Sequence, residues 1–373
     1  MLAVGIEILS RAGQLLSRPQ PMVGYALITL RRETMAISGN FGWDSVGNYK
    51  GATPWTDIGT YVGEEGLLTK EALQATDCLW TVSKRPLFTT SDAVDIDRLD
   101  GVPYGSHRLE EYRAIVRDTD NTNFGIVKKN YHLFQNEDMA VFADELVGDG
   151  SLRIHTAGEL NGGRQVWLLG KVGSTEIVPN DKIDHYLFLY TGHDGSTAFR
   201  CVFTTVRVVC ANTASVALQQ ARGEGVSIRH TKNMSLKTGE ARRVLGISQK
   251  AFEESDDFMR KLADIPMPQS DWIDFCMEIF PTPEEDADGN VSKRAVTRTE
   301  NNRSTLTSLY VDGRGSNIPG VRGTAWGAYN ALTEFAGYHR TTRGDQSKRF
   351  ESLMMGSGAQ FIRNGASVLR ELV

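Results

Sequence analysis

Alternating apolar and polar residues mark several short stretches in the first two thirds of the chain. The clearest are residues 186–190 and 199–209, which flank the turn sequence His193-Asp194-Gly195-Ser196 and are rich in β-branched and aromatic residues. An Asp-Gly pair between two such stretches is the strongest short-range indication of a β-hairpin. We therefore expect an antiparallel hairpin here, with its longer second strand buried.

The residues that follow this hairpin predict a helix and one more strand. Asn212 and Thr213 are favourable N-terminal caps for an amphipathic helix over residues 214–221, and the Gly-Glu-Gly sequence after it is suited to ending a helix. Residues 226–230 then predict a short strand. We expect this unit of hairpin, helix and strand to form the core of the fold.

Shorter periodic stretches upstream predict further elements. Strands are expected over residues 79–87, 112–116, 125–133, 152–155 and 164–169, and helices over residues 69–76 and 136–146. We interpret residues 109–236 as an α+β core domain with a mostly antiparallel sheet. Residues 35–108 are rich in tryptophan and glycine and predict an extended arm, pinned to the body by Trp43, Trp55 and Trp80.

From residue 237 onward the spacing of apolar residues becomes helical. One helix or two are expected over residues 238–264, and single helices over residues 271–280, 301–310, 324–338, 346–355 and 360–372, with an acidic loop at 281–290. The predicted fold class is thus α+β: a mostly antiparallel sheet with a β-hairpin and a packed helix, followed by a helical C-terminal region, residues 237–373. Residues 1–34 match neither pattern, and we expect an upstream extension or a disordered segment, with Met35 as the working start.

Charge is segregated along the chain, although the formal net charge is only −5. Residues 200–243 carry eight basic and two acidic residues. Residues 250–290 carry three basic and twelve acidic residues, and residues 291–370 carry twelve basic and five acidic residues. Because proteins that bind polyanions gather basic residues on one face, the first block is the expected working surface. We expect the acidic block either to shield that surface or to dock on a second subunit, which would make the protein a homo-oligomer.

The sequence holds none of the common catalytic motifs. Phosphate-binding, dinucleotide-binding, zinc-protease and hydrolase patterns are absent, and the four cysteines and seven histidines show no metal-ligand spacing. We therefore expect no cofactor, no metal and no enzymatic activity. No apolar run approaches the roughly 18 residues that a membrane helix needs, so no membrane partner is expected. Scattered cysteines fit a reducing cytoplasm.

Several short motifs follow one another in a distinctive order. They are Thr53-Pro54-Trp55, Trp80-Thr81-Val82, Gly162-Gly163-Arg164-Gln165-Val166-Trp167, His193-Asp194-Gly195-Ser196, Arg207-Val208-Val209-Cys210-Ala211-Asn212-Thr213, Arg229-His230-Thr231 and Gly323-Thr324-Ala325-Trp326-Gly327. Over residues 35–370 the chain resembles the phage/plasmid-like family, a domain of unknown function found in phage and plasmid genes. The resemblance implies a bacterial host and agrees with Met35 as the natural start.

Members of that family have a remote similarity to the single-strand annealing proteins of phage recombination. Those proteins wrap a β-hairpin sheet around a helix, form rings or filaments, and hold single-stranded DNA in a basic groove. The similarity implies that this chain anneals single strands in DNA recombination, without ATP and as a homo-oligomer in the bacterial cytoplasm.

We therefore expect the basic edge of the hairpin unit to bind single-stranded DNA. Arginine and lysine side chains would neutralise phosphates, Asn212 and Thr213 would add hydrogen bonds at a helix start, and Trp167 or His230 would stack a base. The candidate binding residues are Arg164, Trp167, Arg200, Arg207, Asn212, Thr213, Arg229, His230 and Lys232. Each residue could instead have an ordinary structural role. The arginines could extend from strands into water, Asn212 and Thr213 could cap a helix, and Trp167 could pack in the core.

Two other functions fit the same sequence. A metal-dependent enzyme acting on nucleic acid would bring His193, Asp194 and His230 together at one end of the sheet. A host-interaction or plasmid-maintenance protein would instead bind another protein through its C-terminal helices and would not bind DNA.

Overall fold

The structure is a computed structural model that describes residues 42–43, 49–50, 60–62, 65–89, 98–99, 102–103, 107–147, 152–208, 212–214, 226–228, 238–285 and 289–373. All of these residues belong to one unit by contacts, Phe41–Val373. The expectations for residues 1–34 and for Arg229, His230 and Lys232 lie outside the described ranges.

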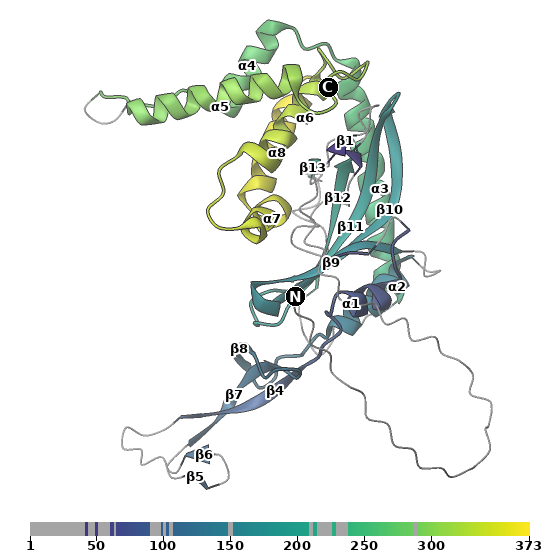
Figure 1. Cartoon of the computed structure of the whole chain (residues 1–373), viewed down its shortest axis with the longest axis vertical. Helices are drawn as coiled ribbons and strands as arrows, with labels where there is room; N and C mark the ends of the chain where they lie inside the picture. Colours follow the sequence, from purple (N-terminus) through teal and green to yellow (C-terminus); the bar gives the residue numbers. More distant parts are fainter. Residues whose placement is uncertain are drawn as a thin grey trace, which may run out of the picture. The chain divides into compact units, whose positions relative to one another are not determined.

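The fold is α+β, and its central element is a seven-stranded antiparallel sheet (Figure 1). Four long strands form a meander around the predicted hairpin, and three short strands complete the edges. They are β9 (Arg153–Leu160), β10 (Gln165–Val178), β11 (Asp181–Gly192), β12 (Phe199–Arg207), β3 (Thr60–Tyr61), β13 (Asn212–Ala214) and β14 (Val226–Ile228). Strands β9, β10 and β11 extend well beyond their predicted ends, whereas β12 ends two residues before its predicted end.

Over most of their length the long strands are apolar on both faces, and helices cover both; the second half of β10 instead exposes Val172, Ser174 and Glu176. Leu168 and Leu189 pair across β10 and β11 and face a core that includes helices α1 (Thr69–Ala75) and α2 (Asn136–Val147). On the other face Trp167 packs against Phe350, with ring centroids 4.8 Å apart. A sheet covered in this way exposes side chains mainly at its turns and edges.

The predicted helix after the hairpin does not begin where the sequence places it. Asn212 to Ala214 form the edge strand β13, in which Asn212 pairs with Arg207 and Thr213 with Val206 of β12. Pairing with an adjacent strand holds this backbone extended and overrides the local capping preference of an Asn-Thr pair. The rest of the predicted helix lies outside the described residues.

A second, three-stranded sheet is built from β4 (Val82–Thr89), β7 (His107–Arg117) and β8 (Asn123–Lys128). Val82, Ile115 and Val127 on one of its faces are buried in the same core as α1 and α2. Trp80, just before β4, is also buried there, as its expected pinning role requires. Two two-stranded ribbons, β1 (Gly42–Trp43) with β2 (Tyr49–Lys50) and β5 (Arg98–Leu99) with β6 (Val102–Pro103), complete the strands described.

The C-terminal region is helical, as expected. Its elements are α3 (Thr238–Asp264), α4 (Gln269–Ile279), α5 (Lys293–Asp312), α6 (Ala325–Glu334), the π-helical turn η2 (Phe335–His339), α7 (Gln346–Met355) and α8 (Ser357–Arg370). Helix α5 begins eight residues before its predicted start because the Ser292 side chain accepts a hydrogen bond from the Ala295 amide and caps it. No helix in the described part of the chain is both long and apolar enough to cross a membrane.

One buried carboxylate joins the central sheet to the C-terminal helices. The oxygens of Asp181 accept hydrogen bonds from Arg207 Nε at 2.6 Å and Nη2 at 2.8 Å, and from Trp326 Nε1 at 2.8 Å. Arg207 also donates to the carbonyl oxygens of Arg314 and Gly315, in the connection between α5 and α6. Asp181 is 0% exposed and Arg207 3% exposed, so strands β11 and β12 and helix α6 share one dry polar contact.

We expect the substitution Arg207→Met to lower the free energy of unfolding by about 3–5 kcal/mol, because it leaves the Asp181 charge buried without its cation. Urea unfolding followed by circular dichroism measures the change. Arg322→Met is the matched control, since Arg322 pairs with Asp312 at 3.7 Å on the surface; its loss should cost less than about 1 kcal/mol. Equal effects of the two substitutions would contradict the anchoring role.

Candidate functional site

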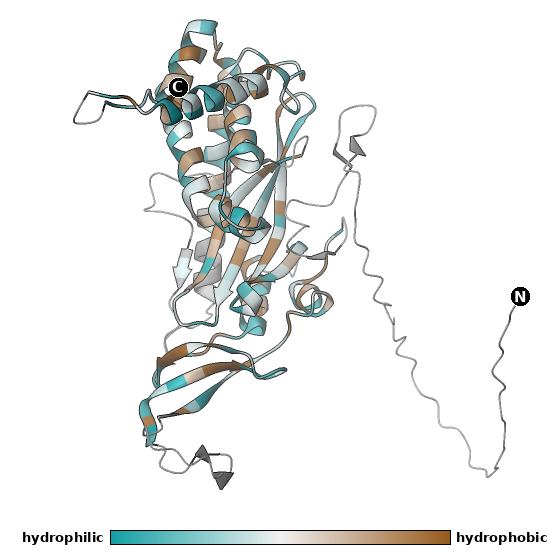
Figure 2. Cartoon of the chain, turned by 60° about the vertical axis from the view of Figure 1, so that its left-hand side comes forward, coloured by the Kyte–Doolittle hydropathy of each residue, from teal (hydrophilic) through white to brown (hydrophobic). Residues whose placement is uncertain are grey.

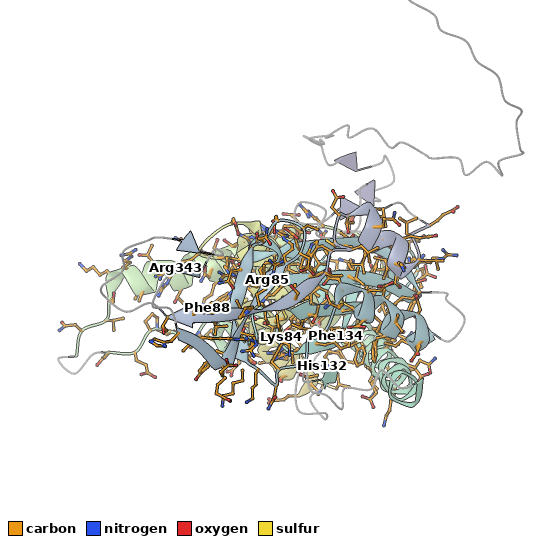
Figure 3. The ribbon with its side chains drawn as sticks, turned by 90° about the horizontal axis from the view of Figure 1, so that it is seen from below. Lys84, Arg85, Phe88, His132, Phe134 and Arg343 are labelled. Carbon is orange, nitrogen blue, oxygen red and sulfur yellow. The ribbon has the colours of Figure 1, made fainter. Side chains whose placement is uncertain are left out.

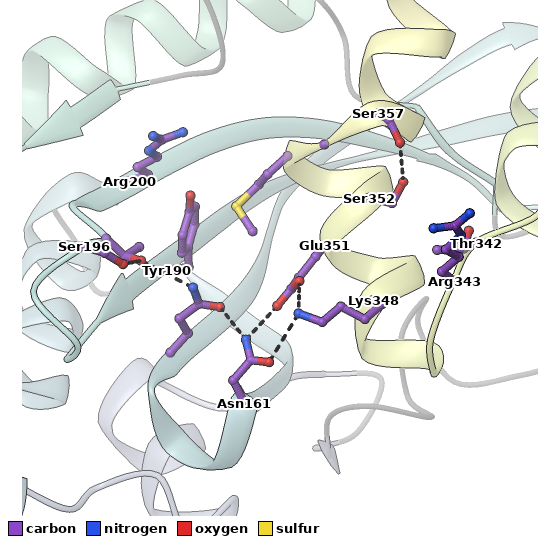
Figure 4. A pocket seen from close by; sticks show the side chains of 14 residues that line it. Asn161, Tyr190, Ser196, Arg200, Thr342, Arg343, Lys348, Glu351, Ser352 and Ser357 are labelled. Atoms are coloured by element: carbon purple, nitrogen blue, oxygen red, sulfur yellow. Dashed lines mark hydrogen bonds and ion pairs between the residues drawn. The ribbon is translucent and has the colours of Figure 1, made fainter. Parts of the chain in front are cut away.

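A polar groove of about 630 Å³ opens beside the hairpin of β11 and β12 (Figure 4). Its walls come from four parts of the chain that are far apart in sequence: the turn before β10, the hairpin, the residues that precede α7, and α7 with the start of α8. We call it the hairpin groove. Its volume lies in the range of small-molecule sites, but its lining is more polar than is usual for them.

The hairpin turn is shaped by its own side chains. The carboxylate of Asp194 accepts hydrogen bonds from the Ser196 amide at 2.9 Å and from its hydroxyl at 2.8 Å. Gly195 adopts a φ of 82°, a conformation that other residues rarely adopt. A Cβ at Gly192 would lie 2.4 Å from Cβ of Thr197, so the close return of the chain requires glycine there. This turn places Ser196 and Thr197 on the groove wall.

A hydrogen-bonded triad links the turn before β10 to helix α7. Glu351 accepts hydrogen bonds from Asn161 Nδ2 and from Lys348 Nζ, both at 2.7 Å. Lys348 also lies 3.4 Å from Asn161 Oδ1. Glu351 is the one carboxylate among the groove's lining residues, and its charge is already matched by Lys348.

Three cations line the hairpin groove: Arg200 from β12, Arg343 from the loop before α7, and Lys348 from α7. Arg343 is exposed and makes no hydrogen bond or ion pair within the part of the chain that the structure describes. The lining residues comprise three cations and one carboxylate, and Lys348 already pairs with that carboxylate. Such a lining attracts anions and disfavours cations.

The predicted binding residues fall in different environments. Arg200 lines the hairpin groove, and Arg164 is exposed at the turn before β10 without lining it. Trp167 is 0% exposed beneath Phe350, so its ring presents no face on which a base could stack. Arg207 is committed to Asp181 inside the protein and is closed to a phosphate. Trp167 and Arg207 therefore have structural roles.

The remaining predicted residues are only partly described or not described. Asn212 and Thr213 lie in strand β13 and not at the start of a helix. They therefore do not offer a phosphate the hydrogen bonds of a helix N-terminus. Arg229, His230 and Lys232 lie outside the described residues.

Sequence reasoning missed most of the groove. Arg343 and Lys348 lie more than 140 residues from Arg200, and only the fold brings them together. The basic block over residues 291–370 is the one sequence feature that pointed to them. The Lys348–Glu351 pair, spaced by three, is an ordinary helix-surface pattern and carried no functional indication.

His193 occupies a structural position and not an open one. It is 2% exposed, and its Nε2 lies 2.8 Å from Asn136 Oδ1. The Asn136 amide nitrogen donates to the carbonyl oxygens of Cys78 and Trp80, so its oxygen faces His193, which must be the donor. Among the residues described, no group of three or more His, Cys, Asp or Glu side chains is placed to hold a metal ion.

Burial also keeps three cysteine thiols protonated. It raises the pKa of Cys78 and of Cys276 to about 11, and it raises that of the fully buried Cys201 as well. Thiols are nucleophilic as thiolates, so these three are poor nucleophiles at neutral pH. The described cysteines are therefore packing residues.

We expect Cys78, Cys201 and Cys276 to react with a chromogenic disulfide reagent in mildly alkaline buffer only after denaturant is added. The measurement uses the Cys210→Ser variant, so that the thiols observed are the three described ones. Rapid reaction of the native variant would show that at least one of these side chains is accessible.

Comparison with known proteins identifies the family of the chain but not its function. The family model described as Domain of unknown function (DUF932) matches residues 123–354, which is more than half of the chain. The match runs from β8 to α7 and so includes the Asp181 anchor and most of the groove lining. Neither the curated proteins nor the solved structures contain a match.

Proposed function

The chain belongs to the DUF932 family, and we propose that it is a phage- or plasmid-derived protein that binds single-stranded DNA and anneals it without consuming a nucleotide. The observation that supports this most is the hairpin groove, where Arg200, Arg343 and Lys348 meet one carboxylate that is already paired. Arginine is well suited to phosphate, because its planar guanidinium donates two parallel hydrogen bonds.

The neutral lining of the groove fits the same ligand. Hydroxyl and amide groups of residues such as Ser196, Thr197 and Gln165 can donate to phosphate oxygens without specifying a base. A groove that contacts the backbone leaves the base edges of a bound strand outward, where a second strand can pair with them. That is the physical requirement of annealing, and it needs no hydrolysis.

We expect the double substitution Arg200→Gln, Arg343→Gln to weaken binding of a labelled single-stranded oligonucleotide about tenfold or more for each arginine that contacts phosphate. The slope of log affinity against log salt should fall in magnitude by about 0.7 per lost contact. Fluorescence anisotropy over about 50 to 200 mM salt measures both.

The matched control is Lys250→Gln, Arg322→Gln, which removes two exposed cations outside the groove. The proposal requires the control to bind nearly as the unchanged protein does. Equal losses would assign the binding to overall charge, and no loss in the groove variant would contradict the groove as the binding site. A strand-annealing assay on the same proteins tests the second half of the proposal.

We also propose that copies of the chain associate through helices α4 and α5. Helix α4 exposes Asp271, Asp274 and Glu278, whereas α5 exposes Lys293, Arg294 and Arg298. None of these six charges forms an ion pair within the described residues, although the two helices pack together through stacked Trp272 and Tyr310 rings 4.0 Å apart.

Exposed apolar side chains accompany the acidic ones. Ile273 is 48% and Met277 44% exposed, one helical turn apart on α4. An apolar stripe flanked by acids on one copy, and a basic helix on the next, form a head-to-tail contact, and such contacts generate rings or filaments. The self-association expected from the segregated charge blocks thus acquires a specific surface.

We expect Asp274→Lys, Glu278→Lys to reduce the oligomer to smaller species, measured by light scattering after size exclusion at low salt. The control Glu253→Lys, Glu254→Lys reverses two exposed acids on α3 and should leave the size unchanged. Mixing the α4 variant with Arg294→Glu, Arg298→Glu should restore association through the swapped charges. A monomeric unchanged protein would contradict this interface.

A further inference from the structure

The hairpin groove contains a carboxylate, although its other charged groups attract anions. Glu351 lines the groove together with Arg200, Arg343 and Lys348. A negative charge beside a bound phosphate repels it, so this carboxylate lowers the affinity of the groove for a polyanion. The presence of Glu351 therefore needs a physical explanation.

Helix α7 directs Glu351 to the groove. The residues of α7 that line the groove are spaced by three or four and share one stripe of the helix: Lys348, Glu351, Ser352 and Met355. Phe350, on another side of the helix, is buried against the sheet. Figure 2 shows this mixture of hydrophilic and hydrophobic residues on the C-terminal helices. Packing of the apolar side thus fixes which stripe of α7 faces the groove.

Both oxygens of the Glu351 carboxylate are held. Oε1 accepts a hydrogen bond from Asn161 Nδ2 and Oε2 accepts one from Lys348 Nζ, both at 2.7 Å (Figure 4). The side chains of Lys348 and Glu351 are 48% and 23% exposed. Those of Lys250 and Glu254, a pair on the surface of α3, are 77% and 46% exposed and lie 3.7 Å apart. The pair in the groove is therefore closer and less exposed than an ordinary surface pair.

Asn161 reaches Glu351 from a turn with an uncommon backbone. Asn161, Gly162 and Gly163 have φ angles of 54°, 70° and 88°, so three consecutive residues are left-handed. Asparagine is one of the few residues besides glycine that adopt this conformation readily. A Cβ at Gly163 would lie 2.7 Å from Arg117 Nη1, so the turn is closely packed. Uncommon backbone conformations persist where the surrounding structure holds them, and they are frequent at functional sites.

We propose that Glu351 sets the affinity of the hairpin groove by holding Lys348 away from the phosphates of a bound strand. Asn161 is the positioning residue, because it orients the carboxylate that Lys348 contacts. Arg200 and Arg343 then bind phosphate without the third cation. Arg343 is exposed and is among the side chains seen from below in Figure 3.

A limited affinity suits a protein that anneals strands. The annealed duplex has to leave the groove before another strand can enter, and a strand held by all three cations would leave slowly. Differences in affinity at one site appear mainly in the dissociation rate. The inference rests on the proposed function and adds to it a residue that controls release.

The test is the substitution Glu351→Gln, which keeps the size of the side chain and an oxygen that can accept a hydrogen bond from Asn161. Without the carboxylate charge, Lys348 can bind a phosphate. The affinity for a labelled single-stranded oligonucleotide should rise about tenfold. The slope of log affinity against log salt should increase in magnitude by about 0.7. Fluorescence anisotropy measures both, and competition with unlabelled strand should show slower dissociation. A residue with only a structural role would not produce this gain.

A second background separates the release of Lys348 from a general gain in positive charge. In the Lys348→Gln variant no cation is available for release, so adding Glu351→Gln should change the affinity less than about threefold, as expected for one exposed charge. Glu254→Gln removes the acid of the pair on α3, outside the groove, and is the matched control that should leave the affinity unchanged. Matching thermal unfolding curves establish that the variants are folded.

Two results would overturn the role of Glu351. One is a folded Glu351→Gln variant that binds the strand no more tightly than the unchanged protein does. The other is an equal gain with and without Lys348, which would assign the effect to charge alone. If the unchanged protein binds no single strand, the proposed function fails together with this inference. If Arg200→Gln, Arg343→Gln weakens binding but Glu351→Gln does not strengthen it, only the inference fails.

Discussion

The structure depends on a carboxylate that water does not reach. Asp181 receives two hydrogen bonds from Arg207 and one from Trp326, and the three residues come from β11, β12 and α6. A buried charge tolerates little rearrangement, because each lost partner would leave part of it uncompensated. The contact therefore fixes the position at which the C-terminal helices meet the sheet. One of those helices, α7, supplies a wall of the hairpin groove.

Helices on both faces of the central sheet leave few of its side chains accessible to a ligand. The residues of β10 and β11 serve packing, with Leu168 and Leu189 toward one helical layer and Trp167 toward the other. The covered part of the central sheet is therefore closed to ligands. The proposed groove lies at the hairpin turn, and the proposed contact between copies lies outside the sheet, on helices α4 and α5.

The sequence predicted the class of fold well and the site poorly. The Asp-Gly hairpin and the helix at 346–355 appear where the patterns placed them, because periodicity and turn chemistry act over a few residues. Asn212 was misread as a helix cap because its strand partner, Arg207, is set by tertiary pairing. Arg207 was expected at a surface because no local pattern discloses Asp181, 26 residues away, as its partner. The groove was missed for the same reason.

A proline in the edge strand β4 has a consequence for aggregation. β4 is an edge strand of the three-stranded sheet, and an edge beside exposed apolar side chains invites another copy to add a strand. Pro86 offers no amide hydrogen to such a strand. A proline within the exposed edge strand thus disfavours the addition of a strand from another copy.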